Sequence, residues 1–244
     1  MSRRVPMWGM SILAIAIWLG EAQPALTQNR GAAPADAKAA APIDLTGYWV
    51  SVISEDWRFR MVTPRKGDYQ NVPMTPEARQ VADAWNPSAD EAAGNQCKAY
   101  GAAAIMRVPG RIHLTWPDVN TLRIEMDAGT QTRLFQFGAA AKAAQPSWQG
   151  ASSATWEPAS RSLKVVTTNM RPGYLRRNGV PYSENAVLTE YFELVPLPNG
   201  GQLLLVTAIV DDPRYLQTPF IVTSQFKKEA DGSKWDPTPC STNY

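Results

Sequence analysis

Apolar and polar residues alternate along much of the chain with a period of two. Residues 111–116 carry an apolar side chain at every second position, and residues 121–127 repeat the pattern after a turn that contains Pro117 and Asn120. Because alternation of this kind is typical of strands with one buried face, the two segments predict a β-hairpin. The same pattern predicts further strands at 47–54, 57–63, 130–137, 151–157, 162–169, 186–195, 202–211 and 220–228.

One segment carries the signals of a helix instead. Thr75 is a suitable N-cap, Pro76 stands at the first helical position and Glu77 faces the positive end of the helix dipole. Apolar residues then follow as far as Trp85, and the Asn-Pro pair at 86–87 is expected to end the helix.

These elements predict an all-β fold with one short helix. Strands and helices do not alternate, which argues against a parallel α/β sheet. We expect an antiparallel meander of about 8–10 strands closed into a barrel, with a two-sheet β-sandwich as the alternative. Closure has the advantage that it removes exposed sheet edges.

Residues 1–27 have the pattern of a secretory signal peptide. Arg3 and Arg4 precede an apolar run over 5–19, and small residues follow. A membrane-spanning helix needs about 20 apolar residues, which this run does not reach. We therefore expect a periplasmic or secreted protein, exported by a Sec-type rather than a twin-arginine route, with no integral membrane span once the signal is removed. An uncleaved anchor is the alternative.

The composition changes again after the signal peptide. Residues 28–42 are rich in Ala and Pro and have no apolar period, which predicts a disordered linker. The length that remains suits one domain with one core, so we expect a single β-barrel domain over 43–244.

Charge and composition narrow the range of functions. The chain has 24 Lys and Arg against 22 Asp and Glu, and we find no basic stripe, so nucleic acid is not an expected partner. One His and two Cys are too few for a multi-histidine metal site or a zinc–cysteine cluster. There is also no Gly-rich phosphate loop, and we expect no metal and no cofactor. The oligomeric state is left open.

The two cysteines, Cys97 and Cys240, predict a disulfide if the protein is exported. The bridge would attach the C-terminal segment to the barrel and would contribute about 4–5 kcal/mol in the chain-entropy model. Two free thiols, one of them reactive, are the alternative, although no histidine lies close in sequence to either cysteine.

The sequence TGYW at residues 46–49 contains a Gly-x-Trp motif at the start of the first predicted strand. With the meander and the disulfide, this motif resembles lipocalins and the wider calycin group, and the resemblance implies a lipocalin-like barrel. Two features differ. The loops after Gly129 are longer than in a small lipocalin, and we find no Arg to pack on the Trp, although Lys227 and Lys228 lie near the last strand.

A second resemblance covers nearly all of residues 43–241. The phrases DLTGYW, LTE-Y-F and DDPRYL-TPF, together with the terminal cysteine, are similar to a family of secreted bacterial proteins of unassigned function. This resemblance implies export and an all-β fold, and it implies no particular chemistry.

The aromatic residues are candidates for the wall of an apolar cavity. Trp49, Trp57, Trp116 and Trp156 are the candidate ligand-binding tryptophans, and they favour a small hydrophobic or aromatic ligand. The alternative for each is that it fills the core or packs beneath a loop.

The loop over residues 171–184 concentrates Tyr, Arg and Glu just before the strand that carries Glu190. Long polar loops at a barrel mouth often carry function. Tyr174 and Arg176 are candidates to hold a ligand carboxylate or phenolate, and the candidate acid–base residues are Tyr182, Glu184 and Glu190. The alternative is a solvated loop with no such role.

Two further polar residues lie on the predicted meander. Arg133 could face the acidic residues of 123–127 across the turn at Gly129, or the two groups could form a solvated outer face. His113 is a fourth catalytic candidate, because histidine titrates near neutral pH without perturbation. A satisfied surface histidine is the alternative.

Two functions are consistent with these observations. The first is an exported protein that binds a small hydrophobic or aromatic molecule in the barrel. The second is a cofactor-independent lyase, isomerase or cyclase that uses Tyr, Arg and Glu inside the barrel. Its architecture would resemble phenolic acid decarboxylases or allene oxide cyclases, whose motifs do not match here residue by residue.

Overall fold

The structure is a computed structural model that describes residues 36–138, 145–198 and 200–242. The predicted signal peptide, residues 1–27, and residues 28–35 of the predicted linker lie outside the described residues. None of the helices in the described ranges combines the length and the hydropathy that a membrane span requires.

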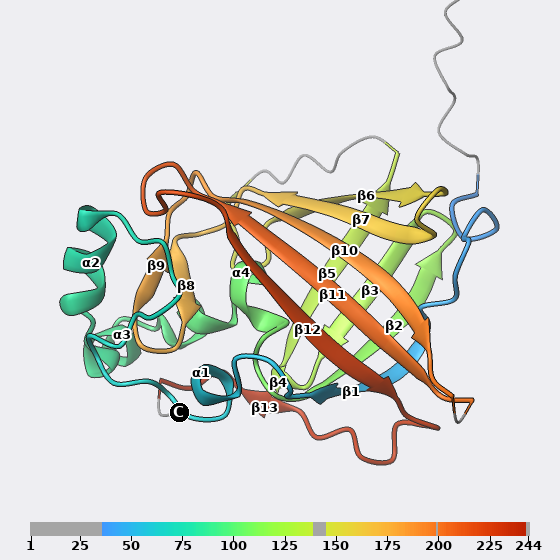
Figure 1. Ribbon diagram of the computed structural model, residues 1–244, viewed down its shortest axis with the longest axis horizontal. Coiled ribbons are helices and arrows are strands. Elements are labelled where there is room, and N and C mark those ends of the chain that lie inside the picture. The colour runs from blue at the N-terminus through green and yellow to red at the C-terminus, as the bar shows by residue number, and fades with distance from the viewer. Residues whose placement is uncertain (1–35, 139–144, 199, 243–244) are drawn as a thin grey trace, which may run out of the picture. The chain divides into compact units, whose positions relative to one another are not determined.

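Nine strands form a closed barrel, which confirms the predicted all-β fold (Figure 1). Neighbours follow the order β1-β12-β11-β10-β7-β6-β5-β3-β2, and β2 pairs with β1 to close the ring. All neighbours are antiparallel except β5 and β6, which are parallel. The bounds are β1 Gly47–Val52, β2 Arg111–Asp118, β3 Thr121–Met126, β5 Gln131–Phe137, β6 Ala151–Glu157, β7 Ser162–Thr168, β10 Val187–Pro196, β11 Gln202–Asp211 and β12 Phe220–Lys228.

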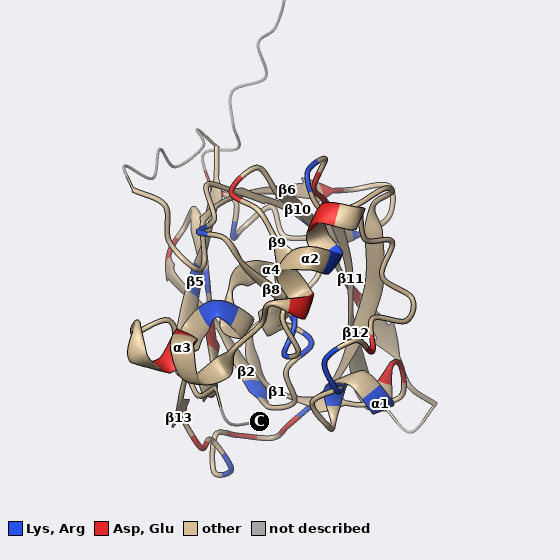
Figure 2. Cartoon of the chain, turned by 90° about the vertical axis from the view of Figure 1, so that its left-hand side faces the viewer, with Lys and Arg blue, Asp and Glu red and all other residues tan. Residues whose placement is uncertain are grey.

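Shorter elements cover one end of the barrel, which faces the viewer in Figure 2. We call this group of elements the cap. They are α1 Trp57–Arg60, α2 Pro76–Asp83, α3 Pro87–Ala92, the 3₁₀ helix η1 Gln96–Tyr100, α4 Ala102–Ile105, and the hairpin of β8 Gly173–Arg176 and β9 Val180–Tyr182. Apolar side chains of α2, α4, β8 and β9 form a second core with residues from β10, β11 and β12, whereas those of η1 pack in the barrel core.

The cap contains more helix than the sequence pattern predicts. The segment 57–63 was expected to be a strand, but its first four residues form α1. Apolar residues at Trp57 and Phe59 fit a period of two, yet so short a run does not distinguish that period from the helical one. Packing favours the helix, because the adjacent residues Phe59 and Arg60 are both buried. In a strand, adjacent side chains would point to opposite faces.

The predicted helix is confirmed as α2. The Thr75 side chain accepts a hydrogen bond from the Ala78 amide at 3.2 Å, and Pro76 is the first helical residue. The helix ends at Asp83, earlier than predicted, so Trp85 lies outside it. Asn86 and Pro87 instead begin α3, where the Asn86 side chain accepts a hydrogen bond from the Ala89 amide at 3.3 Å.

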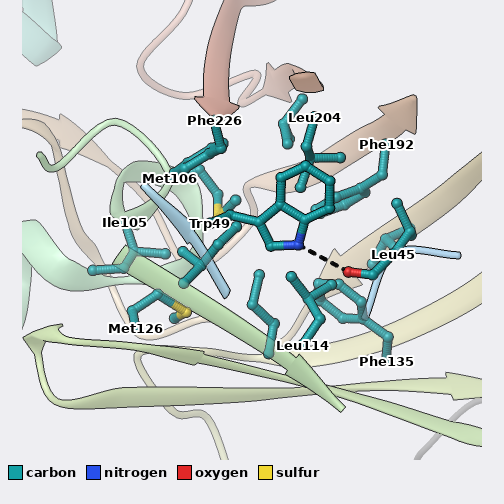
Figure 3. Packing of buried hydrophobic residues seen from close by; sticks show 14 of the residues in the cluster. Leu45, Trp49, Ile105, Met106, Leu114, Met126, Phe135, Phe192, Leu204 and Phe226 are labelled. Atoms are coloured by element: carbon teal, nitrogen blue, oxygen red, sulfur yellow. Dashed lines mark hydrogen bonds between the residues drawn. The ribbon is translucent and has the colours of Figure 1, made fainter. Parts of the chain in front are cut away.

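Trp49 lies at the centre of the barrel core (Figure 3). It is fully buried, and its indole Nε1 donates a hydrogen bond to the Leu45 carbonyl at 3.0 Å. Lys228, its register partner on β12, holds its ammonium 4.3 Å from the ring centroid. A cation from the last strand therefore packs on this Trp, which is compatible with a lipocalin-like barrel, although the cation is Lys.

The predicted disulfide between Cys97 and Cys240 is confirmed. It attaches the C-terminal segment to η1 of the cap. Next to it, β13 (Thr238–Pro239) pairs in parallel with the two-residue strand β4 (Ala128–Gly129). The C-terminal segment is thus held by a covalent bond and by backbone pairing at neighbouring positions.

Residues 36–42, the last part of the predicted linker, pack against the end of the barrel that the cap leaves uncovered. Ala37 is fully buried, and its amide donates to Asn120 Oδ1 at 3.1 Å. The Lys38 amide donates to the Val119 carbonyl at 3.0 Å. Ala37 and Lys38, which belong to the predicted disordered linker, are therefore held against the barrel.

Candidate functional site

The barrel interior holds a buried ion pair between Arg133 on β5 and Glu190 on β10, which we call the barrel pair. Arg133 Nη1 donates to Glu190 Oε1 at 3.0 Å, and Nη2 donates to Oε2. Nη2 also donates to Thr167 Oγ1 at 3.1 Å. The two side chains are 0% and 1% exposed, so this bidentate contact is shielded from water.

The strand register explains why Arg133 points inward. Arg133 lies opposite Ile124, and Thr132 lies opposite Glu125. The suggested cluster of Arg133 with the acidic residues of 123–127 is therefore wrong. The strands pair one residue away from the register that the cluster requires, and a shift of one residue moves a side chain to the other face of the sheet. Arg133 shares the inner face with Phe135 and lies across the barrel from the carboxylate of Glu190.

The end of the barrel opposite the cap carries three half-buried aromatic residues, Trp116, Phe137 and Trp156. We call it the aromatic end. The Trp116 and Phe137 ring centroids are 5.5 Å apart, and those of Phe137 and Trp156 are 5.4 Å apart. The indole Nε1 of Trp156 donates to the Ala37 carbonyl at 2.8 Å. Segment 36–42 therefore lies against the aromatic end through backbone contacts.

Two open grooves run along this segment where it leads into β1. The first has a volume of about 590 Å³ and is lined by apolar side chains at Ile43, Leu114 and Trp116, with Lys38 and His113 among its polar residues. The second has a volume of about 650 Å³ and shares residues 42–44 with the first. Its other lining residues come from β10 and from the turns beside it.

The structure places the four predicted catalytic residues in separate environments. Tyr182 is fully buried in the cap, where burial raises the pKa of its hydroxyl, and its oxygen has no hydrogen-bond partner among the described residues. Glu184 is exposed and lies 3.6 Å from Arg214. Glu190 belongs to the barrel pair. His113 lies between β1 and β3 on the outer face, stacked at 3.9 Å on Tyr48 and 3.4 Å from Glu125.

The predicted ligand-binding residues are also spread over the molecule. Trp49 belongs to the barrel core, whereas Trp57 is 63% exposed on α1. Tyr174 donates to Asp90 Oδ2 at 2.7 Å within the cap. Arg176 is buried there as well, beside two arginines that the sequence reading did not single out. Of the predicted set, Trp116 and Trp156 come together at the aromatic end, and Arg133 meets Glu190.

The described residues contain no group of three or more His, Cys, Asp or Glu side chains that could hold a metal ion. Comparison of the chain with family models, with curated proteins and with solved structures found no match. The barrel, its two ends and the side chains described above are therefore the features that indicate a function.

Proposed function

We propose that the protein is an exported binding protein for a small hydrophobic or aromatic molecule, and that the ligand binds at the aromatic end of the barrel. A closed β-barrel is a fold that can hold a ligand. The observation that carries the proposal is the aromatic end itself, where Trp116 both stacks on Phe137 and lines an open groove.

The packing of the barrel interior favours its end as the binding site. Large side chains fill the middle of the barrel, among them Trp49, Phe135, Phe192 and Phe226, all at most 1% exposed (Figure 3). A ligand there would have to displace well-packed side chains, which is costly. At the aromatic end a ligand would instead contact rings that are only partly buried.

The first groove suits a small ligand in size and in chemistry. Its volume of about 590 Å³ lies within the range of about 300–1,000 Å³ that is common for small-molecule sites. Ile43 and Trp116 provide apolar contacts, and Lys38 and His113 provide polar groups that can fix the orientation of a ligand.

Export is part of the proposal and is supported by the disulfide, since such bonds persist in oxidising compartments. A protein recovered from the periplasm or the medium is expected to lack residues 1–27, a loss that intact-mass measurement detects. Retention of the whole N-terminus in the recovered protein would contradict a cleaved signal peptide.

No observation favours the enzymatic alternative. Both carboxylate oxygens of Glu190 accept hydrogen bonds from Arg133, so the side chain is already engaged within the barrel core. Tyr182, Glu184 and His113 lie in three other surroundings, whereas general acid–base catalysis requires the groups within reach of one substrate.

The proposal is tested by titrating the purified protein with a panel of aromatic and terpenoid compounds while Trp fluorescence is recorded. Binding at the aromatic end is expected to give a saturable change that Trp116→Leu abolishes or weakens by more than tenfold, a loss within the range for a buried aromatic contact. Mass spectrometry of lipophilic compounds that purify with the protein identifies candidates for the panel.

Trp57→Leu is the matched control, because this exposed Trp lies on α1 in the cap. It is expected to leave the affinity unchanged. Equal loss in both variants would show binding that is not specific to the aromatic end. The absence of any response in the panel, together with the absence of a co-purifying compound, would overturn the proposal.

A further inference from the structure

We propose that three buried arginines in the cap form a binding site for a small dianionic oxyanion, phosphate or sulfate. Arg60 on α1, Arg107 just after α4 and Arg176 on β8 form this arginine cluster, and each is at most 6% exposed. They line one small cavity, together with Arg177. Figure 2 shows blue segments on α1 and on the loops beside it.

The cluster contains more positive than negative charge. Within the described residues the carboxylate in contact with it is that of Asp56, which lies 3.0 Å from Arg107 Nη2 and 3.8 Å from Arg176 Nη2. The carboxylates of Glu55 and Asp68 act on the cluster from a greater distance, and Asp68 also forms an ion pair with Arg58. With three guanidinium groups and one contacting carboxylate, the cavity has an excess of positive charge, whereas buried charges are ordinarily paired.

Several donors of the cluster lack partners. Arg60 Nη2, Arg107 Nη1 and Arg176 Nε are buried and have no hydrogen-bond partner within the described part of the chain. Other nitrogens of the same groups are held in place: Arg60 Nε donates to the Arg107 carbonyl at 2.9 Å, and Arg176 Nη1 donates to the Gln70 carbonyl at 2.6 Å. The guanidinium groups are therefore oriented before any anion arrives, which lowers the cost of binding.

The surroundings strengthen the attraction for an anion. The Arg176 guanidinium lies 4.0 Å from the ring centroid of Phe59, and the lining residues other than arginines are apolar. Burial, together with the charge of Arg107, lowers the pKa of both Arg60 and Arg176 to about 10. An anion bound here would offset this repulsion in a poorly solvated site, where electrostatic interactions are strong.

The size of the cavity limits the ligand. Its volume is about 20 Å³, and it opens to solvent. This is space for about one water-sized group, so one oxygen of an oxyanion can enter while the remainder faces the opening. A large organic ligand does not fit, and the excess of positive charge favours a dianion over a carboxylate or a chloride ion.

The site is separate from the proposed ligand site at the aromatic end. Arg107 precedes the first residue of β2, whereas Trp116 lies near the last residue of that strand. A variant that loses anion binding at the arginine cluster can therefore still be tested for ligand binding at the aromatic end.

The experiment uses the purified protein in a buffer without phosphate, sulfate or chloride, at constant ionic strength. Inorganic phosphate and sulfate are titrated separately, with acetate and chloride as comparison anions, and binding is followed by calorimetry and by the melting temperature. Phosphate or sulfate is expected to give saturable binding. Arg60→Gln and Arg176→Gln are each expected to weaken it by roughly 10- to 100-fold, as for the loss of a charged hydrogen bond.

Arg79→Gln is the matched control, because Arg79 is exposed on α2 of the cap and does not line the cavity. It is expected to keep the wild-type affinity. In the wild-type protein, the side-chain Nε–H signals of Arg60, Arg107 and Arg176 are expected to shift in NMR spectra when the anion is added. This readout stands even if a variant fails to fold.

Three results would each overturn the proposal. One is the absence of saturable binding of phosphate and of sulfate to the wild-type protein. Another is a response to acetate or chloride as strong as that to the dianions. The third is unchanged affinity in both folded arginine variants, or unshifted signals from the three arginines at saturation.

Discussion

The barrel pair and the arginine cluster bury the same kind of side chain with opposite outcomes. Arg133 meets one carboxylate, Glu190, through two hydrogen bonds, and the pair is neutral. Within the described residues, the carboxylate in contact with the arginine cluster is that of Asp56, which lies near Arg107 and Arg176. The barrel pair lies on two strands whose register fixes both partners, whereas the cluster is assembled from short elements of the cap. The barrel therefore pairs its buried arginine with one carboxylate, whereas the cap buries more arginines than contacting carboxylates, as the proposed anion site requires.

The largest expected effect comes from breaking the barrel pair. Glu190→Gln leaves the Arg133 charge buried without its counter-charge, which should lower the free energy of unfolding by about 3–5 kcal/mol. Urea unfolding followed by circular dichroism measures this loss. Glu184→Gln, at an exposed carboxylate, is the control and should change stability by less than about 0.5 kcal/mol.

The double variant Arg133→Leu with Glu190→Leu sharpens the same test. Because it removes both charges from the core, its stability should lie close to that of the wild-type protein or above it. A double variant as unstable as Glu190→Gln would mean that packing, and not the unpaired charge, causes the loss.

A smaller effect is expected from Asp56→Asn, which increases the charge imbalance of the arginine cluster. Asp56 has a φ of 51°, and Asn tolerates this left-handed conformation, so the change mainly removes the charge. In a buffer without phosphate or sulfate we expect a loss of about 1–3 kcal/mol in unfolding free energy. Added phosphate should restore part of this loss.

Asp211→Asn is the control for that experiment, because Asp211 is exposed at the end of β11. Its unfolding free energy should stay near the wild-type value with and without phosphate. If Asp56→Asn were as stable as this control in every buffer, the cluster would not depend on Asp56 for its charge balance.

The smallest effect concerns the buried hydroxyl of Tyr182. In the part of the chain that the structure describes this hydroxyl makes no hydrogen bond, so Tyr182→Phe should leave stability near neutral pH unchanged or slightly higher. Tyr69→Phe removes a hydroxyl that donates to Asp83 at 2.8 Å and should cost about 1 kcal/mol. Chemical unfolding of both variants compares the two hydroxyls, and equal losses would contradict the assignment.

The stability difference between the wild-type protein and Tyr182→Phe should also depend on pH. Burial raises the pKa of Tyr182 above the value of about 10 expected in the unfolded chain. The unfolded chain therefore loses this proton first, and stability falls above pH 10. The wild-type protein should lose about 1 kcal/mol relative to Tyr182→Phe by pH 11. Parallel unfolding curves at pH 8 and pH 11 measure the difference.

Most of the barrel could be predicted from the sequence, because regular strands carry a clear period. The bounds of β6, β11 and β12 match the expected ranges, and the disulfide follows from two cysteines and the expected export. Even the barrel pair has a signal in the sequence. Glu190 stands between the inward positions Leu188 and Phe192, and Arg133 stands two residues before Phe135.

The arginine cluster could not be predicted in this way. Arg60 and Arg107 lie in short segments that have no measurable period, and their meeting with Arg176 depends on the tertiary packing of the cap. The packing of residues 36–42 was missed for a related reason, since Ala37 is held by backbone contacts that leave no mark in side-chain composition.

The closure of the barrel by its first and last strands has a consequence for folding. Trp49 on β1 pairs with Ile112 on one side and with Lys228 on the other, so the ring stays open until β12 has joined the sheet. Until then β1 and β11 each present unpaired N–H and C=O groups, which are a template for pairing with another chain. A chain truncated before Phe220 should therefore aggregate, because the last strand is what keeps the sheet from joining a second molecule.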